Sequence, residues 1–303
     1  MTKQQLRSNL LLLLGAAIWG FAFVAQRVGM RYIGAFTFNG VRFALGALSL
    51  LPLLALQAHQ TVGEPAAAPR GRHARLHTLL SGGLLGCVLF SAASLQQIGL
   101  YTTTAGKAGF ITGMYILLVP IFGIFFGRKN PPLTWVSVLI ATAGLYLISV
   151  TGAFTIAPGD LYELAGACLF AVHIMMVDVL SKRIPALKLS LMQFVTCSAL
   201  SLLTAAFTER ISFSGILAAA VPLLYGGILS VGVAYTLQIV GQKHAQPAVA
   251  SILMSFESVF SCIGGILLLH ETLGLRGTVG CLLMVAGMIL SQAEIFRRRK
   301  PAG

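Results

Sequence analysis

The side chains that could carry chemistry in this sequence are polar residues that stand singly within long apolar stretches. Glu257 is the only acid placed centrally in such a stretch, and helical spacing puts it on one face with Ala250, Ser261 and Gly264. Burial at this depth disfavours the charged carboxylate, so we interpret Glu257 as a group that exchanges a proton or forms a gate. The alternative is a structural acid that caps a helix end or pairs once with a basic group.

Two basic residues also fall within or beside apolar stretches. Arg42 shares a helical face with Asn39, Gly46 and Ser49. It either lies near the outer interface and binds backbone carbonyls or a neighbouring helix, or it binds an anion. Lys107 follows three threonines at the start of another stretch, where it either extends its ammonium group to the interface or attracts anionic groups.

Two glutamines occupy equivalent places in a repeated motif. The segment 94–99 (SLQQIG) returns as 236–241 (TLQIVG), so Gln96 and Gln238 are related by a sequence offset of 142. In two related halves, such a pair is expected to bind the substrate or to form alternate gates. The alternative is a pair of interhelical hydrogen bonds, each worth under about 1 kcal/mol.

Three further side chains each have a specific interpretation. Trp19 either lines an amphipathic cavity or packs in the core or at the interface. His173 is either a hydrogen-bonded core histidine or a proton relay. Asp178 precedes Lys182 by one helical turn, so we expect an ion pair between them at the membrane interface.

The repeat extends along the chain with a changing offset. Early in each half the offset is 151 residues, since Arg42 and Phe43 match Gln193 and Phe194. The polar loop between residues 57 and 76 absorbs the nine-residue change to 142. A hydrophobic chain of two related halves indicates a transporter, because such halves can rock about a site between them.

The elements that position these residues are membrane spans. Hydrophobic residues make up 57% and charged residues 10% of the chain, and the mean hydropathy is +0.88, which excludes a soluble domain. Ten apolar stretches are each long enough to cross about 30 Å of hydrocarbon as a helix. Five spans per half, an odd number, invert the second half relative to the first, and Pro120 and Pro222 are candidate kinks. The predicted spans are Leu10–Val28, Ala35–Leu56, Thr78–Leu100, Ala105–Phe126, Leu133–Val150, Asp160–Leu180, Leu189–Phe207, Val221–Gly241, Ala248–Leu269 and Leu275–Ile295.

The net charge of +13 reflects membrane topology rather than binding of nucleic acid. With the N-terminus in the cytoplasm, 15 of the 21 basic residues fall on the cytoplasmic side, which is the positive-inside bias. We therefore predict a multi-pass protein with both termini cytoplasmic and no nucleic-acid partner. The cytoplasmic basic residues are Lys3, Arg7, Arg70, Arg72, Arg75, Arg128, Lys129, Lys182, Arg183, Lys188, Lys243, Arg297, Arg298, Arg299 and Lys300.

No catalytic or cofactor motif accompanies the spans. The chain lacks a Walker sequence, a GxGxxG motif after a strand and an HExxH motif. Its five cysteines fall within predicted spans and form no CxxC pair. We predict no enzyme activity, no cofactor and no metal, and no transport driven by ATP hydrolysis in this chain.

Several segments together resemble a known transporter family. Segments 15–23 (GAAIWGFAF) and 39–44 (NGVRFA) are similar to the first two helices of the EamA family of the drug/metabolite transporter superfamily. Segment 103–110 (TTAGKAGF) is similar to its fourth helix, and segment 248–253 (AVASIL) with Glu257 to its ninth. The resemblance covers about residues 8–296.

This resemblance implies an all-α membrane protein of ten helices, built as two inverted five-helix repeats. The repeats are expected at residues 8–151 and 158–296, followed by a basic cytoplasmic tail at 297–303. The family's cavity is lined mainly by spans 1, 3, 4, 6, 8 and 9. The candidate residues for substrate binding or gating are Trp19, Gln96, Tyr115, His173, Tyr235, Gln238 and Glu257, with Arg42 and Lys107 as charged candidates.

The implied function is secondary transport in the bacterial inner membrane. We predict export of a small amphipathic metabolite, such as an amino acid, by alternating access, with a proton as the hypothetical coupling ion. An antiporter of phosphorylated metabolites or nucleotide sugars is the alternative, although it needs several cavity-facing cations and only Arg42 and Lys107 are available. A membrane-embedded enzyme or sensor is the third interpretation. The sequence predicts no oligomeric state.

Overall fold

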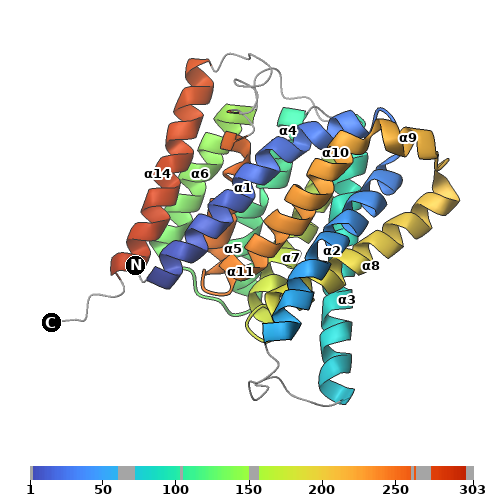
Figure 1. The fold of residues 1–303 in the computed structure, drawn as a ribbon. Coiled ribbons are helices and arrows are strands. Elements are labelled where there is room, and N and C mark those ends of the chain that lie inside the picture. Colours follow the sequence, from blue (N-terminus) through green and yellow to red (C-terminus); the bar gives the residue numbers. More distant parts are fainter. Residues whose placement is uncertain are drawn as a thin grey trace.

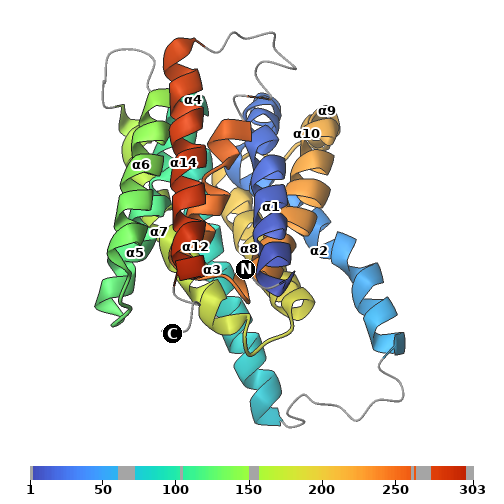
Figure 2. The ribbon, with the colours of Figure 1, turned by 90° about the vertical axis from the view of Figure 1, so that its left-hand side faces the viewer.

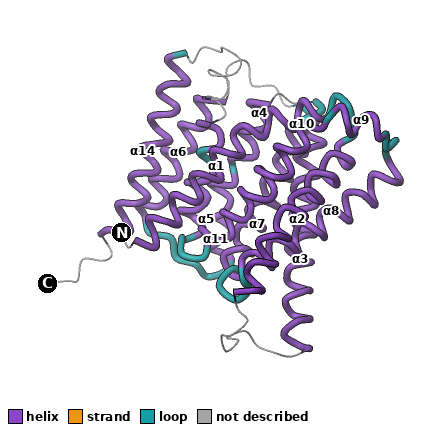
Figure 3. The backbone as a smooth tube through the Cα atoms, in the orientation of Figure 1, coloured by secondary structure: helices purple, strands orange, loops and turns teal. Residues whose placement is uncertain are grey.

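The computed structural model describes residues 3–60, 72–102, 105–149, 157–260, 263 and 274–297, and its regular elements in these ranges are helices (Figure 3). They are α1 (Lys3–Gly29), α2 (Ala35–Gln60), α3 (Arg72–Gly99), α4 (Ala105–Gly113), α5 (Tyr115–Phe125), α6 (Pro132–Ser149), α7 (Pro158–Leu180), α8 (Ala186–Thr208), α9 (Phe213–Ala218), α10 (Ala220–Leu224), the π-helix η1 (Tyr225–Tyr235), α11 (Thr236–Gln242), α12 (Pro247–Met254) and α14 (Leu275–Arg297).

The helices correspond to the ten predicted spans. Seven helical segments are long and apolar enough to cross a membrane, and three shorter apolar helices cover Pro132–Leu147, Pro247–Phe260 and Leu275–Ser291. The helices before and after the polar loop are longer than predicted, since α2 continues to Gln60 and α3 begins at Arg72. The short helix α9 was not predicted. The predicted end of the ninth span lies outside the described residues.

The helices pack in equivalent sets that relate the two halves. In the second half α7 is equivalent to α1, α8 to α2, and η1 with α11 to α3. The contact of α3 with α7 therefore corresponds to that of η1 and α11 with α1, and the contact of α3 with α8 corresponds to that of η1 with α2. The equivalent pairs α2–α8 and α6–α14 also contact each other directly. Within these pairs the two helices run in opposite directions (Figures 1 and 2). The halves are therefore duplicated and inverted relative to each other, as predicted.

The first and last helices place the two ends of the described chain at the same end of the bundle. The start of α1 and the end of α14 lie at the same end (Figure 2). The end of α2 and the start of α3 project from that end as well (Figure 1). An even number of crossings is consistent with this placement.

The fourth and ninth spans are interrupted at equivalent positions. The amide of Met114 donates to the carbonyl of Ile111 at 3.1 Å, and the amide of Phe256 donates to Leu253 at 3.4 Å. Each bond spans three residues instead of the four of an α-helix, so the turn tightens there. Met114 and Phe256 are repeat equivalents, because they are related by the same offset as Gln96 and Gln238. The chain is therefore interrupted at the same position in these two equivalent spans.

The interruptions do not coincide with the candidate proline kinks. Pro120 lies inside α5, six residues after the break at Met114. Pro222 lies within α10, and the π-helix η1 begins three residues later, at Tyr225. The positions of the two prolines therefore do not predict where the helical geometry changes.

Glycines let η1 approach α2 closely. A Cβ on Gly227 would lie 2.5 Å from Cβ of Leu45 and 3.0 Å from the carbonyl oxygen of Arg42. Only a residue without a side chain fits this spacing between the two backbones. The approach places the middle of α2, with Arg42, against the π-helix at the interface between the halves.

Candidate functional site

A cavity lies between the two halves of the bundle. Its volume is about 50 Å³, and since a buried water needs about 10–15 Å³ of such space, it holds only a few waters. Each half contributes eight of the sixteen lining side chains, so the cavity belongs to the interface between the repeats. The lining residues are Trp19, Ala22, Phe23, Gln26, Arg42, Gln96, Thr112, Tyr115, Phe170, His173, Ile174, Ser230, Tyr235, Gln238, Met254 and Glu257.

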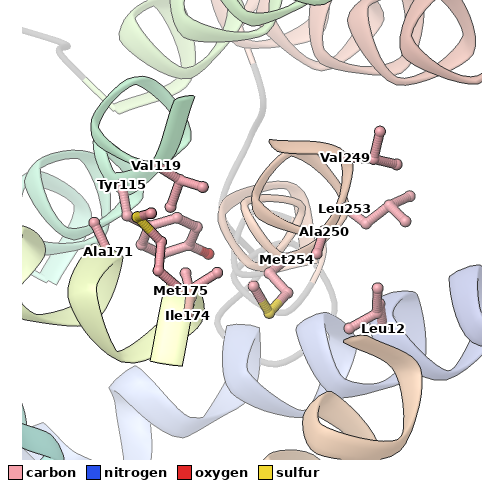
Figure 4. Close-up of a cluster of buried hydrophobic side chains, with 10 residues drawn as sticks. All are labelled: Leu12, Tyr115, Val119, Ala171, Ile174, Met175, Val249, Ala250, Leu253 and Met254. Carbon is pink, nitrogen blue, oxygen red and sulfur yellow. The ribbon is translucent and has the colours of Figure 1, made fainter. Parts of the chain in front are cut away.

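Glu257 is bonded to a tyrosine from the other half. The hydroxyl of Tyr115 donates to Oε1 of Glu257 at 3.1 Å, and each residue is only 5% exposed. Each is the first residue after the break in its span. Figure 4 shows the Tyr115 hydroxyl pointing toward α12, within a cluster of buried apolar side chains that includes Ala250. Among the described residues no basic side chain pairs with Glu257, so its partner is a neutral donor.

Aromatic side chains form one wall of the cavity. The ring centroids of Trp19 and Tyr235 lie 4.8 Å apart in an edge-to-face arrangement, and Nε1 of Trp19 donates to the carbonyl oxygen of Ser230 at 3.1 Å. The Tyr235 ring also lies 6.1 Å from both Phe43 and Phe194. Ring pairs at these distances are mutually stabilising and hold each other in place. The wall is therefore apolar and rigid, with polar atoms at its edges.

Arg42 lies in the cavity wall rather than at an outer interface. The residue is 2% exposed, and its guanidinium carbon lies 5.6 Å from the ring centroid of Phe38 and 5.1 Å from that of Phe43. The ring faces attract the cation. Within the described part of the chain Arg42 has no carboxylate partner, and its Nε donates no hydrogen bond. The arrangement leaves a guanidinium group available to an anionic group in the cavity.

His173 is a hydrogen-bonded core histidine that also lines the cavity. Its Nε2 lies 2.8 Å from Oε1 of Gln193, and the side chain is fully buried. Gln193 is the repeat equivalent of Arg42, and Ala22 is the equivalent of His173, each 151 residues away. The second half therefore has a bonded pair where the first half has arginine and alanine, which makes the cavity electrically asymmetric.

The two repeat-related glutamines make different contacts. Nε2 of Gln96 donates to Oγ1 of Thr112 at 3.2 Å, and Thr112 donates to Oε2 of Glu163 at 2.9 Å. Nε2 of Gln238 instead donates to Oε1 of Gln242 at 3.1 Å, and Oε1 of Gln238 is buried without a partner among the described residues. Both amides line the cavity, but only Gln96 connects it to a buried acid.

Glu163 is a buried acid that sequence reasoning missed. It lies in the second turn of α7, near a predicted span end, where a carboxylate usually meets solvent or headgroups. In the structure it is completely buried, at 0% exposure, so Glu257 is not the only acid held inside the bundle. The sequence repeat could have predicted this burial, because the equivalent residue 151 positions earlier is the apolar Leu12.

The remaining charged candidates lie apart from the cavity or outside the described residues. The side chain of Lys107 is not among those described, so its role stays an expectation. Asp178 accepts from Lys182 at 2.7 Å, as expected, and also from Arg128 at 2.7 Å. This ionic cluster ties the end of α7 to the α5–α6 connection and does not line the cavity.

The described residues contain no group of three or more His, Cys, Asp or Glu side chains that could hold a metal ion. Cys87, Cys168, Cys197 and Cys281 are free thiols in this part of the chain. The described lining thus offers one cation, one acid, several amide and hydroxyl groups and an aromatic wall. Such a set can pack against apolar groups and form hydrogen bonds with polar ones.

Comparisons with known proteins agree with this architecture. An uncharacterized transporter of Archaeoglobus fulgidus is 28% identical over 96% of this chain and 88% of its own length. The uncharacterized inner membrane transporter YedA of Escherichia coli strain K12 is 26% identical over 84% of this chain and 81% of its own. A solved crystal structure, 18% identical, shares the fold with a TM-score of 0.78, over 97% of this chain and 99% of that one.

A family model matches the chain twice, at residues 6–150 and 157–292. The two matches start 151 residues apart and end 142 residues apart. These are the two repeat offsets found in the sequence. Together they cover most of the chain. The chain belongs to the EamA-like transporter family.

Proposed function

We propose that this multi-pass membrane transporter exports a small amphipathic metabolite, such as an amino acid or a related compound. The proposal rests on one observation: Arg42 and Glu257 line the same cavity, each without an oppositely charged partner among the described residues. A zwitterion supplies a carboxylate for the guanidinium and an ammonium for the carboxylate. The aromatic wall at Trp19 and Tyr235 suits the apolar part of such a molecule.

Alternating access is the proposed mechanism. A cavity that holds a few waters has to widen before a metabolite enters, so the halves must move relative to each other. The equivalent breaks at Met114 and Phe256 are suitable hinge points, because each lies beside a cavity residue. The moving units are the proposed repeats at residues 8–151 and 158–296, with 297–303 as a cytoplasmic tail.

Proton movement is the proposed driving force. Glu257 is a buried acid in the cavity wall whose hydrogen-bond partner, Tyr115, is neutral. Release and uptake of a proton by this carboxyl change the charge that the substrate meets. We propose that the protein lies in a bacterial inner membrane with both termini in the cytoplasm, where the basic residues concentrate.

The alternative substrates fit the cavity less well. A phosphorylated metabolite or nucleotide sugar needs several cationic side chains around its phosphate groups. Arg42 is the one Lys or Arg among the described lining residues, and the Lys107 side chain is outside them. A membrane enzyme or sensor is disfavoured by the family, which is one of transporters.

Reconstitution tests this function directly. Liposomes that contain the purified full-length protein are loaded with one unlabelled amino acid at a time. Uptake of the labelled form of the same amino acid is then measured without ATP. We expect counterflow of at least one zwitterion and no counterflow of the corresponding decarboxylated amine. Strict ATP dependence, or exchange of phosphate esters alone, contradicts the proposal. Liposomes containing the Arg42→Gln variant are the matched control, since glutamine stands at the equivalent position of the other half.

A further inference from the structure

Glu163 occupies a position that an apolar side chain fills in the other half. A Cβ on Gly99 would lie 2.7 Å from Cγ of Glu163, and a Cβ on Gly241 would lie 2.8 Å from Cγ of Leu12. Gly99 and Gly241 are repeat equivalents, as are Glu163 and Leu12. The same close helix contact is thus made by a carboxylic acid in one place and a leucine in the other. Packing requires a side chain of this size but not a carboxyl group.

Thr112, which belongs to the first half, also has an apolar equivalent. Its repeat equivalent in the second half is Met254. Both side chains line the cavity, but only Thr112 can pass a hydrogen bond from the cavity to the acid behind it. The contact between Thr112 of the first half and Glu163 of the second half is therefore polar and hydrogen-bonded, whereas the equivalent positions, Met254 and Leu12, are both apolar.

The direction of the hydrogen bonds that link Gln96, Thr112 and Glu163 depends on whether Glu163 is protonated. In the structure Gln96 donates to Thr112 and Thr112 donates to Glu163, which only accepts. A protonated carboxyl becomes a donor. If its O–H turns to Thr112, the threonine hydroxyl no longer donates to Glu163, and its own O–H can turn to donate to Gln96. The Gln96 amide then presents its carbonyl oxygen to Thr112 and its NH₂ group to the cavity.

We propose that Glu163 is a second proton-binding site of the transporter, and that its proton sets, through Thr112, which end of the Gln96 amide faces the substrate. Proton binding behind the wall is thereby converted into a change of hydrogen-bonding polarity at the cavity surface. The inference rests on the proposed proton-coupled transport. It adds a site that differs from Glu257 in its hydrogen-bond partner and in its place behind the cavity wall.

The surroundings of Glu163 contain few other charges. On its own helix Asp160 lies one turn earlier and accepts from the amide of Ala157 at 2.6 Å. From α3 the neighbour is Gly99, and from α4 it is Thr112. Oε1 of Glu163 has no hydrogen-bond partner among the described residues. A buried carboxylate with one hydrogen bond is costly, which gives protonation a driving force.

Infrared difference spectroscopy tests the proposal without any substrate. The purified full-length protein in lipid nanodiscs is titrated from about pH 4 to about pH 10. These limits are the pKa values of free carboxyl groups and free tyrosine side chains. Besides absorption by Glu257, we expect a second carboxylic acid band, which Glu163→Gln removes completely and Glu257→Gln leaves in place. We also expect an amide change that Gln96→Ala removes, and this amide change should vanish in Glu163→Gln and Thr112→Val. It should persist in Thr112→Ser, which restores the hydroxyl group, and in Glu257→Gln.

One further variant controls for folding, and two outcomes of the spectroscopy would contradict the proposal. Glu163→Leu carries the residue of the equivalent position and should unfold within a few degrees of the wild type, which separates packing from proton binding. Titration of Glu163 without a change at Gln96 overturns the coupling, and absence of a Glu163 band overturns the site. Because no transport is measured, the spectra can support this inference even if no zwitterion is exported, and the reverse also holds.

Discussion

The hydroxyl of Tyr115 donates to the carboxylate of Glu257 at 3.1 Å, although the two residues hold the same position in the two halves of the chain. Equivalent positions meet only where they lie near the axis that relates the halves. Each follows the interruption of its span, so the contact joins the two broken helices. Movement of one half against the other changes this contact directly.

Glu257→Gln should remove most of the pH dependence of transport. Glutamine keeps the shape and the bond to Tyr115 but binds no proton, so we expect a rate about tenfold lower and a flat pH profile. The measurement is counterflow at a series of pH values. Tyr115→Phe is the companion variant, and it should shift the profile without flattening it. A wild-type rate and profile in folded Glu257→Gln would make the acid structural.

Gln96→Ala and Gln238→Ala should each reduce transport while leaving protein abundance near the wild type. The effects should be unequal, because only Gln96 reaches Glu163, whereas Gln238 is bonded to Gln242. Transport is measured in both directions across the liposome membrane and divided by the amount of folded protein. Loss of folded protein in proportion to activity would show that both amides only hold the bundle together.

Arg42→Gln should weaken recognition of a substrate carboxylate. A hydrogen bond to a charged group is worth about 1.5–3 kcal/mol, so we expect the apparent KM for a zwitterion to rise about tenfold or more. Competition by a decarboxylated analogue should change far less. Arg27→Gln is the matched control, because Arg27 is an exposed arginine at the end of α1. Equal effects of both variants would contradict a binding role for Arg42.

Gly144→Ala should destabilise the packing of α6 on α14. The added Cβ would lie 2.5 Å from the carbonyl oxygen of Gly280 and 2.8 Å from the amide nitrogen of Met284, and backbone atoms cannot turn aside. Overpacking of this kind costs about 1–3 kcal/mol. Thermal unfolding in detergent should show a clear decrease in Tm. Gly83→Ala is the control, since its nearest neighbour is 4.0 Å away, and it should leave Tm unchanged.

Reporter fusions should place the C-terminus and the loop at residues 57–76 in the cytoplasm. The reason is the excess of basic residues on that side, together with the common end of the bundle at which α1 begins and α14 ends (Figure 2). A phosphatase active only in the periplasm should be inactive at both sites, and a fluorescent protein active only in the cytoplasm should be active. Periplasmic activity at the C-terminus would refute the proposed topology.

Much of the fold was predictable because hydrophobic length and internal repetition are local properties of a sequence. The ten apolar stretches and the two offsets sufficed for the spans and the duplication. The cavity also lies where related halves meet, and all seven uncharged and acidic candidates, with Arg42, line it. Their roles in transport stay predictions.

The parts that sequence reasoning missed depend on packing between distant segments. The break at Met114 lies six residues before Pro120, and the residue equivalent to Pro120 in the other half is Cys262, so proline does not predict both breaks. The π-helix η1 contacts α2 closely at Gly227, and no local sequence pattern predicted either feature. Glu163 stands near a predicted helix end, yet α3 and α4 cover it completely.

The unequal pair Arg42 and Gln193 gives the protein a property that two identical copies of one half cannot have. A symmetric pair of single repeats carries either two arginines or two glutamines at these positions, so its cavity looks the same from both membrane faces. One continuous chain can hold a cation from its first half and an acid, Glu257, from its second. In the proposed transport, a zwitterion is therefore expected to lie in the cavity in one orientation and to cross the membrane with the same end leading.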